Sequence, residues 1–297
     1  MNFSLLDKIL SSQGAILVTI LRTKGHTYQK AGGRALFTPG SVTPLWGNLG
    51  ALCIDQSILE AGERALTENR PLRVRIDTSD DADALIGTGT ACGGEMDLLI
   101  EPVRESHQDV YRQLRETIAR GTPVTLSHNL TTGELSLTQS GTADTHFTES
   151  IPAPPQLFFF GATPLARTLL GIVADMDFSL HLVDWRPALL DGFRDVARLT
   201  FHQNFGPFDR KSFVLVLSHS FERDLGVIEA ALRARCRYVG LLSSTTRREQ
   251  MYDALEGKGA TREQLDQIHS PVGLDIGART DAEIAVSIVA QLIEVTR

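Results

Sequence analysis

The second half of the chain alternates short apolar segments with longer amphipathic ones, and this alternation limits the possible folds more than any other feature. The apolar segments have the length and composition of buried strands, and they lie at 156–160, 180–184, 213–218 and 238–242. Stretches with helical spacing alternate with these segments, and they predict helices at about 165–173, 222–235, 246–256 and 282–294. Apolar strands that alternate with helices are typical of a parallel sheet covered on both faces. The sequence therefore predicts a Rossmann-like α/β domain, with a mainly parallel sheet, over residues 156–297.

The first half has a different pattern, in which half-buried strands and glycine turns are interspersed with amphipathic helices. Helices are predicted at 3–11, 55–68 and 108–120, and strands at 14–21, 34–37, 71–76 and 96–101. Residues 121–155 are rich in Thr, Ser and Gly and end in Ile151-Pro-Ala-Pro-Pro155, a stiff, extended connector. We therefore expect an α+β domain over residues 1–150, with the domain boundary in this connector.

Charge and apolar patterning exclude several classes of protein. The formal net charge is −7, which argues against nucleic acid as the main partner. No apolar stretch approaches the 18 residues needed to span a bilayer. The first residues lack the basic start and apolar core of an export signal, so we expect a cytoplasmic protein.

Three cysteines, Cys53, Cys92 and Cys236, are widely spaced, with no Cys-x-x-Cys pair, so neither a disulfide framework nor a tetrahedral zinc site is predicted. Cys92 lies in the glycine-rich segment 87–94 (GTGTACGG). Such a loop can present several backbone N–H groups to an anion and lower the pKa of its thiol, although a buried structural cysteine beside a turn fits too. Cys53 directly precedes a predicted helix and is a second candidate thiolate, with core filling as the alternative.

The first strand-to-helix turn of the second half resembles a dinucleotide-binding loop. Gly161 fits the first glycine of G-x-G-x-x-A, but Thr163 stands at the second glycine, where a side chain obstructs a pyrophosphate. Asp184 ends the next predicted strand, at the spacing where an acidic side chain binds a ribose hydroxyl. Capping of the strand end by Asp184 is the structural alternative.

A second candidate anion site is the segment 243–248 (SSTTRR), which leaves a predicted strand and opens a helix. Its hydroxyls, free N–H groups and the guanidiniums of Arg247 and Arg248 suit an anion such as phosphate. Helix capping with solvated arginines explains the same residues without a ligand.

Three segments together resemble the XdhC/CoxI family of accessory proteins of xanthine dehydrogenase and related molybdenum hydroxylases. They are Cys92-Gly-Gly with its glycine-rich lead, the strand Tyr238–Leu242, and the long stretch 271–288 (PVGLDIGARTDAEIAVSI). The resemblance covers nearly the whole chain in the family's order and is weakest over 102–155. The chain departs from the family pattern at Gly50-Ala-Leu-Cys53, at Thr163-Pro164 and at Ser243-Ser244.

The resemblance implies a maturation factor without turnover of its own. Such a chaperone binds molybdenum cofactor, as molybdopterin or a nucleotide form of it, and protects it while its terminal sulfido ligand is installed. It then delivers the cofactor to an apo-enzyme of the xanthine dehydrogenase/aldehyde oxidase type. A cysteine desulfurase and the apo-hydroxylase are the implied partners, and a homodimer is expected.

The family pattern makes Cys92, with Gly93 and Gly94, the leading cofactor contact, and Cys53 the second. A thiolate suits the soft metal–dithiolene end of the cofactor, and Arg247 or Arg248 suits its phosphate. Two alternatives remain open on the sequence. An NAD(P)-dependent oxidoreductase would use Gly161 and Asp184, and an interaction scaffold would bind no cofactor.

Overall fold

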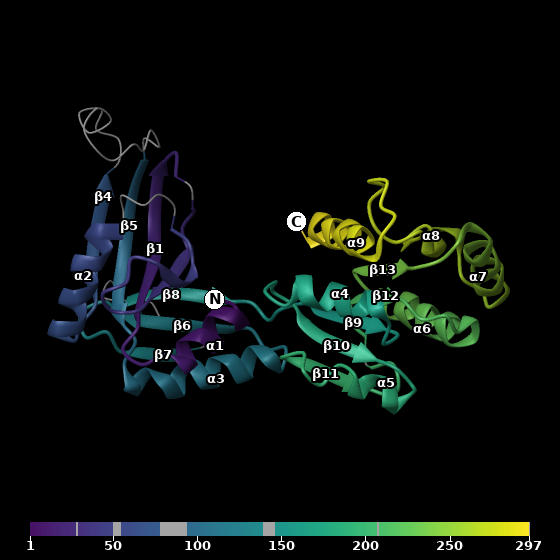
Figure 1. The fold of residues 1–297 in the computed structure, drawn as a ribbon, viewed down its shortest axis with the longest axis horizontal. Coiled ribbons are helices and arrows are strands. Elements are labelled where there is room, and N and C mark those ends of the chain that lie inside the picture. The colour runs from purple at the N-terminus through teal and green to yellow at the C-terminus, as the bar shows by residue number, and fades with distance from the viewer. Residues whose placement is uncertain (28, 50–54, 78–93, 139–145, 207, 297) are drawn as a thin grey trace. The chain divides into compact units, whose positions relative to one another are not determined.

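The chain divides into two compact units, Met1–Ala153 and Pro154–Arg297, in a computed structural model (Figure 1). The structure describes residues 1–27, 29–49, 55–77, 94–138, 146–206 and 208–296. Each unit contains its own buried apolar clusters. Among the described residues, no helix has both the length and the apolar composition needed to cross a bilayer.

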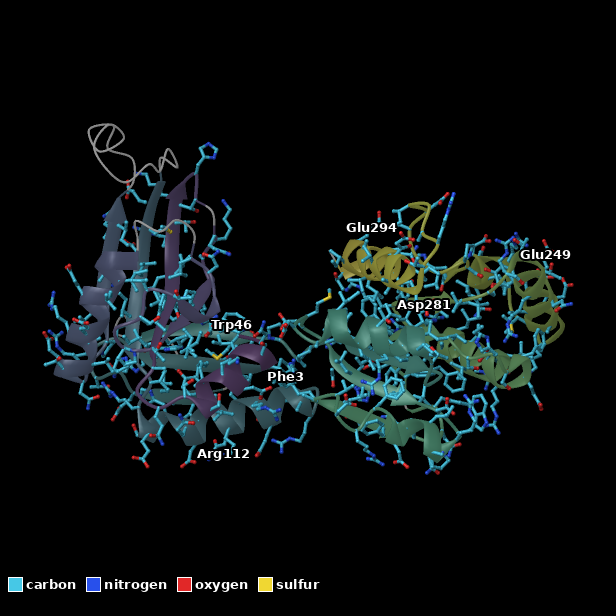
Figure 2. The ribbon with its side chains drawn as sticks, viewed as in Figure 1. Phe3, Trp46, Arg112, Glu249, Asp281 and Glu294 are labelled. Atoms are coloured by element: carbon cyan, nitrogen blue, oxygen red, sulfur yellow. The ribbon has the colours of Figure 1, made fainter. Side chains whose placement is uncertain are left out.

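The N-terminal unit contains a five-stranded antiparallel sheet with the order β3-β2-β1-β5-β4. Its strands are β1 (Ile16–Gly25), β2 (Arg34–Phe37), β3 (Pro44–Gly47), β4 (Leu72–Asp77) and β5 (Gly94–Pro102). Successive residues of β1 point to opposite faces, so Ile16 and Val18 pack under α2 (Asp55–Glu68), while Leu17 packs with α1 (Phe3–Ser11) and α3 (Gln108–Ala119). A short 3₁₀ helix, η2 (Glu105–His107), leads into α3. Phe3 and Trp46, labelled in Figure 2, pack on the α1 side of the sheet.

The described residues between 121 and 155 contain three strands that the sequence did not predict. They are β6 (Val124–Asn129), β7 (Leu135–Thr138) and β8 (His146–Ile151), which form an antiparallel sheet with the order β7-β6-β8. The sequence did not predict these strands, because their composition is rich in Thr and Ser and their apolar alternation is short. In β8, every second residue is exposed.

A cluster of charged side chains is buried in the N-terminal unit. Arg34 of β2 forms an ion pair with Glu149 of β8, and His128 Nδ1 of β6 donates a hydrogen bond to Glu101 Oε2 of β5 at 3.0 Å. His128 Nε2 lies 3.7 Å from Glu149 Oε1. All four side chains are at most 15% exposed. The cluster therefore connects strands of both sheets through charges that water does not screen.

The pKa values of this cluster follow from burial and from its opposite charges. Burial favours the neutral form of His128, but the hydrogen bond with Glu101 and the nearby Glu149 carboxylate outweigh it and raise the pKa of His128 to about 9. Burial likewise opposes ionisation of Glu149, yet His128 and Arg34 lower the pKa of Glu149 to about 2. His128 and Glu149 are therefore both charged near neutral pH.

The C-terminal unit is a doubly wound α/β fold with a six-stranded sheet. The strand order is β11-β10-β9-β12-β13-β14, and every neighbouring pair is parallel. The strands are β9 (Gln156–Phe160), β10 (Ser179–Val183), β11 (Leu199–His202), β12 (Phe213–Val216), β13 (Tyr238–Leu241) and β14 (Ile268–His269). This order reverses direction between β9 and β12, as in dinucleotide-binding Rossmann folds.

Helices cover both faces of the parallel sheet, each over a separate apolar cluster. One cluster lies under α4 (Pro164–Val173), α5 (Pro187–Asp191) and α9 (Asp281–Thr296), and the other under α6 (Phe221–Ala234), α7 (Thr245–Gly257) and α8 (Arg262–Leu265). The predicted fold class is confirmed in both halves. The short elements α5, β11, α8 and β14 were not predicted, because segments of two to five residues carry little periodicity.

Candidate functional site

The residues expected to contact a cofactor in the N-terminal half fall largely outside the described structure. Cys53, Cys92 and Gly93 all lie outside the described residues. Gly94 is described: it is buried, opens β5 and pairs with Gly25 at the end of β1. A Cβ on Gly94 would lie 2.5 Å from the His26 carbonyl oxygen, so only glycine fits. Gly94 therefore opens β5 at a close approach to the backbone of His26.

Cys236, the described cysteine, has the properties of a structural residue. It is half-buried beside the α6–α7 cluster of the C-terminal unit. Burial and the nearby carboxylate of Asp209 raise the pKa of its thiol to about 12. A thiol that stays protonated is a poor nucleophile and a poor metal ligand. Cys236 therefore serves as the matched control for the other two cysteines.

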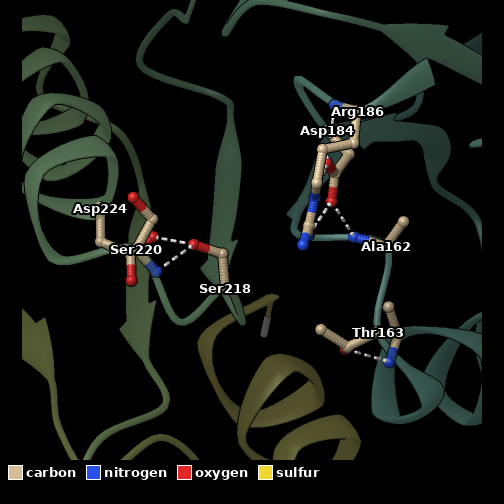
Figure 3. Close-up of polar contacts among 8 residues, drawn as sticks. Ala162, Thr163, Asp184, Arg186, Ser218, Ser220 and Asp224 are labelled. Carbon is tan, nitrogen blue, oxygen red and sulfur yellow. Dashed lines mark hydrogen bonds and ion pairs between the residues drawn. The ribbon is translucent and has the colours of Figure 1, made fainter. Parts of the chain in front are cut away.

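The loops after β9, β10 and β12 meet at the carboxyl edge of the sheet, where Ala162 contacts Asp184 (Figure 3) and Gly161 packs against Ser218. Gly161 directly follows β9 and has a φ of +113°. A Cβ at this position would lie 2.8 Å from the Ser218 nitrogen and 2.9 Å from the Ser218 Cα. Its own N–H donates to the Val183 carbonyl at 2.8 Å. The packing of the loop after β12 thus explains this glycine without a bound phosphate.

Replacing Gly161 with alanine is expected to destabilise the C-terminal unit by about 1–3 kcal/mol, because the positive φ strains an L-residue and the added methyl group meets backbone atoms. Chemical denaturation of the Gly161→Ala variant measures the loss. Gly171→Ala, at a helical position where a Cβ meets nothing within 4 Å, is the control and is expected to be neutral or stabilising. Equal stability of Gly161→Ala and the wild type would contradict this account.

Asp184, expected to bind a ribose hydroxyl, is saturated by donors from the protein itself. Its Oδ2 accepts the Ala162 N–H and Arg186 Nη2, both at 2.9 Å, and its Oδ1 accepts the Arg186 N–H at 3.0 Å and Arg186 Nε at 2.9 Å (Figure 3). A carboxylate offers about four acceptor positions, and these four bonds use them. The side chain is fully buried, and burial alone would raise its pKa, but the hydrogen bonds from Arg186 and Ala162 hold the pKa of Asp184 below its usual range. In this structure Asp184 connects two loops.

The loop after β9 also directs its N–H groups into the protein. Ala162 donates to Asp184, and Thr163 donates to the Gly161 carbonyl at 3.0 Å. The Thr163 hydroxyl caps α4 by accepting the Ala166 N–H at 3.2 Å, and Pro164 has no N–H to offer. A pyrophosphate would have to compete with these bonds and with the Thr163 side chain.

Arg247, expected to bind an anion, forms an internal ion pair. Its Nη2 lies 2.6 Å from Asp224 Oδ2, and its Nη1 donates to the His219 carbonyl at 3.4 Å. The Asp224 side chain is fully buried and also accepts the Ser218 hydroxyl. Burial raises the pKa of Asp224, while Ser218 and Arg247 act in the opposite direction. Arg247 therefore holds the loop after β12 to the start of α7.

Arg248 and the stretch 271–288 also make contacts within the unit. Arg248 Nη1 donates to the Ser270 carbonyl at 3.2 Å, next to the cis peptide bond between Ser270 and Pro271. The side-chain amide of Gln291 in α9 accepts the Gly273 N–H at 2.9 Å and the Tyr238 hydroxyl at 2.6 Å. This stretch, the most specific part of the resemblance, is thus fixed to α9 and β13 by buried polar groups.

The sequence did not predict the residues that bind Asp184 and Arg247 within the protein, which are Arg186 and Asp224. Arg186 follows Asp184 by two residues, a spacing that suggests no particular contact, and Asp224 lies in the first turn of α6, where acidic residues are common. Asp184 and Arg186 pair within one loop, after β10, whereas the pair of Asp224 and Arg247 joins α6 to α7. Among the described residues there is no group of three or more His, Cys, Asp and Glu side chains that could hold a metal ion.

Comparison with known proteins shows the family to which the chain belongs. A model described as the XdhC and CoxI family matches residues 9–77, and one described as the XdhC Rossmann domain matches residues 157–292. The chain belongs to the XdhC/CoxI family. The match to the family's two models follows the order that the sequence predicted.

Relatives of this XdhC/CoxI protein match along almost its full length. A probable xanthine dehydrogenase subunit from Bacillus subtilis is 27% identical, covering 99% of this chain and 97% of that protein. The molybdenum cofactor insertion chaperone PaoD of Escherichia coli is 22% identical, covering 97% of this chain and 86% of its own length. A crystal structure of a xanthine dehydrogenase from Bacillus halodurans aligns with a TM-score of 0.81 at 25% identity, covering 100% of this chain and 96% of that one.

Proposed function

We propose that this protein is a molybdenum cofactor-binding chaperone, which supports sulfuration of the cofactor and its insertion into a xanthine dehydrogenase/aldehyde oxidase-type hydroxylase. The observation that carries the proposal is the match to PaoD, named as a molybdenum cofactor insertion chaperone, along 97% of this chain. The relative named as part of a xanthine dehydrogenase supports a hydroxylase of that type as the client. We further propose that a cysteine desulfurase supplies the sulfur, that the protein acts in the cytoplasm, and that it forms a homodimer.

Cofactor binding is assigned to the segment around Cys92, with Gly93 and Gly94, and to Cys53 as a second thiolate. The cofactor, as molybdopterin or a nucleotide form, supplies a soft metal–dithiolene centre, and a thiolate is the side chain best matched to it. Gly94 supports this assignment, because it follows Cys92-Gly93 directly in the chain and its close approach to the His26 carbonyl leaves no room for a side chain. Residues 1–150 would then act as the cofactor-binding domain, joined to the Rossmann-like domain 156–297.

The phosphate of the cofactor is assigned to an arginine of the segment 243–248. Arg248 fits this role better than Arg247, because Arg247 would have to give up its contact with the buried carboxylate of Asp224. Arg248 donates to one backbone carbonyl, at 3.2 Å, and a guanidinium has five N–H donors. Binding of a phosphate by Arg248 would therefore leave no buried charge without a partner.

The Cys92→Ala variant is purified from cells that make the cofactor. We expect its content of molybdenum and pterin per chain to be at most about one tenth of the wild-type content, because loss of a metal–thiolate contact weakens binding by more than about 1.4 kcal/mol. Elemental analysis and the fluorescence of oxidised pterin measure both components. Cys236→Ala, at the half-buried cysteine, is the control and should bind as the wild type does.

Two outcomes would contradict the proposal at different levels. Equal cofactor content in Cys92→Ala and the wild type would remove Cys92 from the site while leaving the chaperone function in place. A wild-type protein that carries neither molybdenum nor pterin would instead favour the interaction scaffold. The alternative of an NAD(P)-dependent oxidoreductase rests on Gly161 and Asp184, which are engaged by contacts within the protein.

A further inference from the structure

A cavity of about 330 Å³ opens at the carboxyl edge of the parallel sheet, beside the point where the strand order reverses. Its walls come from four consecutive strand ends or the helices that follow them. They include Phe160 at the end of β9, Trp185 after β10, residues 203–205 after β11, and Glu222 and Arg223 in the first turn of α6. Ligands of open α/β sheets bind in this crevice, and none of the residues assigned above to a cofactor lines it.

The cavity walls present flat π surfaces. The guanidinium carbons of Arg186 and Arg223 lie 4.4 Å and 4.6 Å from the Trp185 ring, and the Phe160 ring centroid lies 6.2 Å from that of Trp185. Phe205 is 47% exposed, although a large apolar side chain gains free energy when it is covered. Aromatic rings and guanidinium planes both stack on planar heterocycles.

Polar groups around these surfaces match the edges of a heterocycle. The side-chain amides of Gln203 and Asn204 each offer a donor and an acceptor, and the Glu222 carboxylate accepts from amino or ring N–H groups. Arg223 adds a positive charge at the rim, where it is exposed to solvent. A ligand that satisfies all of these groups is planar, rich in ring nitrogens and anionic.

The same edge is unsuited to a dinucleotide. Asp184, which would bind the ribose, already accepts four hydrogen bonds, and the N–H groups of Ala162 and Thr163 are used within the protein. The phosphate of a ligand in the cavity would therefore contact Arg223 rather than the loop after β9.

We propose that this cavity binds the planar nitrogen heterocycle of a phosphorylated ligand, with the ring against the exposed Phe205 and the phosphate at Arg223. A mononucleotide base and a pterin share this chemistry. Binding of a mononucleotide would be independent of the proposed chaperone function, whereas binding of a pterin rests on that function and would place the cofactor phosphate at Arg223 instead of Arg248.

Isothermal titration calorimetry of the full chain with AMP, GMP, CMP, neopterin and NADH tests the proposal. We expect saturable binding of at least one nucleotide or of neopterin with a Kd below about 1 mM. Binding of nucleotides alone identifies a nucleotide site, and binding of neopterin alone identifies a pterin site. No binding by any of these compounds overturns the proposal, and binding of NADH at least tenfold tighter than AMP overturns the exclusion of a dinucleotide.

Substitutions at the exposed rim locate the site without disturbing the core. Phe205→Ala is expected to weaken binding at least about fivefold through lost stacking. If the ligand is a nucleotide, Arg223→Gln should weaken the nucleotide and leave the corresponding nucleoside unchanged. Arg233→Gln, at a 73% exposed position on the same helix, is the control. Binding that neither Phe205→Ala nor Arg223→Gln alters would show that the ligand lies elsewhere. Molybdenum content, measured separately, reports on the chaperone function and not on this cavity.

Discussion

The His128→Leu variant should lose about 3–5 kcal/mol of the free energy of unfolding of the N-terminal unit near pH 6, because it leaves the carboxylates of Glu101 and Glu149 buried with one positive partner, Arg34. The two tryptophans, Trp46 and Trp185, lie in different units. In a Trp185→Phe background, tryptophan fluorescence during urea denaturation therefore reports the N-terminal unit alone.

The same variant should also change how stability depends on pH. The pKa of His128 is raised to about 9 in the folded chain, so its stabilising contribution is complete below its unfolded pKa of about 6.5. That contribution, roughly 3 kcal/mol, is lost as pH rises from about 6.5 through 9. The pKa of Glu149 is lowered to about 2, so its contribution is present above about pH 4.5 and is lost as pH falls toward 2. The cluster therefore stabilises the unit most between about pH 4.5 and 6.5.

His128→Leu is thus expected to show little of the alkaline loss that the wild type shows. His146→Leu, at an exposed position on β8, is the matched control and should stay within about 0.5 kcal/mol of the wild type at every pH. Parallel pH profiles for the wild type and His128→Leu would refute the assignment of the alkaline loss to His128.

The second large effect is expected for Arg247→Met, at about 3–5 kcal/mol of the free energy of unfolding of the C-terminal unit. Among the described residues, the substitution leaves the fully buried Asp224 carboxylate with the Ser218 hydroxyl as its remaining side-chain hydrogen-bond donor. The pKa of Asp224 is already raised by burial, and loss of Arg247 would raise it further. The destabilisation should therefore increase as pH rises through the pKa of Asp224.

A double substitution separates this account from a loss of packing. Arg247→Met combined with Asp224→Asn should be more stable than Arg247→Met alone, because no unpaired charge remains buried. Arg248→Met, which removes a single hydrogen bond to the Ser270 carbonyl, is the control and should cost about 1 kcal/mol. Trp185 fluorescence in a Trp46→Phe background reports this unit. If Arg247→Met is as stable as the wild type and instead loses bound cofactor, Arg247 belongs to the cofactor site.

The sequence predicted Arg247 and Arg248 as anion-binding residues, but it could not predict the groups that they contact within the protein. The segment 243–248 is a helix start with exposed donors, and this part of the prediction agrees with Ser244 as the cap of α7. The carboxylate that occupies Arg247 comes from α6, 23 residues earlier, and no local pattern marks Asp224 as a buried partner. Glu101 and His128 likewise meet only because β5 and β6 belong to adjacent sheets of the unit.

The apolar alternation by itself determined the class of both domains, because apolar burial is the dominant free-energy term and it follows sequence periodicity directly. The glycine-rich loop at 87–94, the strand at 238–242 and the stretch 271–288 were sufficient to indicate the family. Only the tertiary structure decided which polar residues are available to a ligand. A hydrogen bond or an ion pair forms only when two groups lie within a few ångströms of each other, and the sequence does not give the distance between distant segments. The structure shows that Gly161 and Asp184 hold loops together. It also shows the cavity beside Trp185, which no sequence pattern indicated.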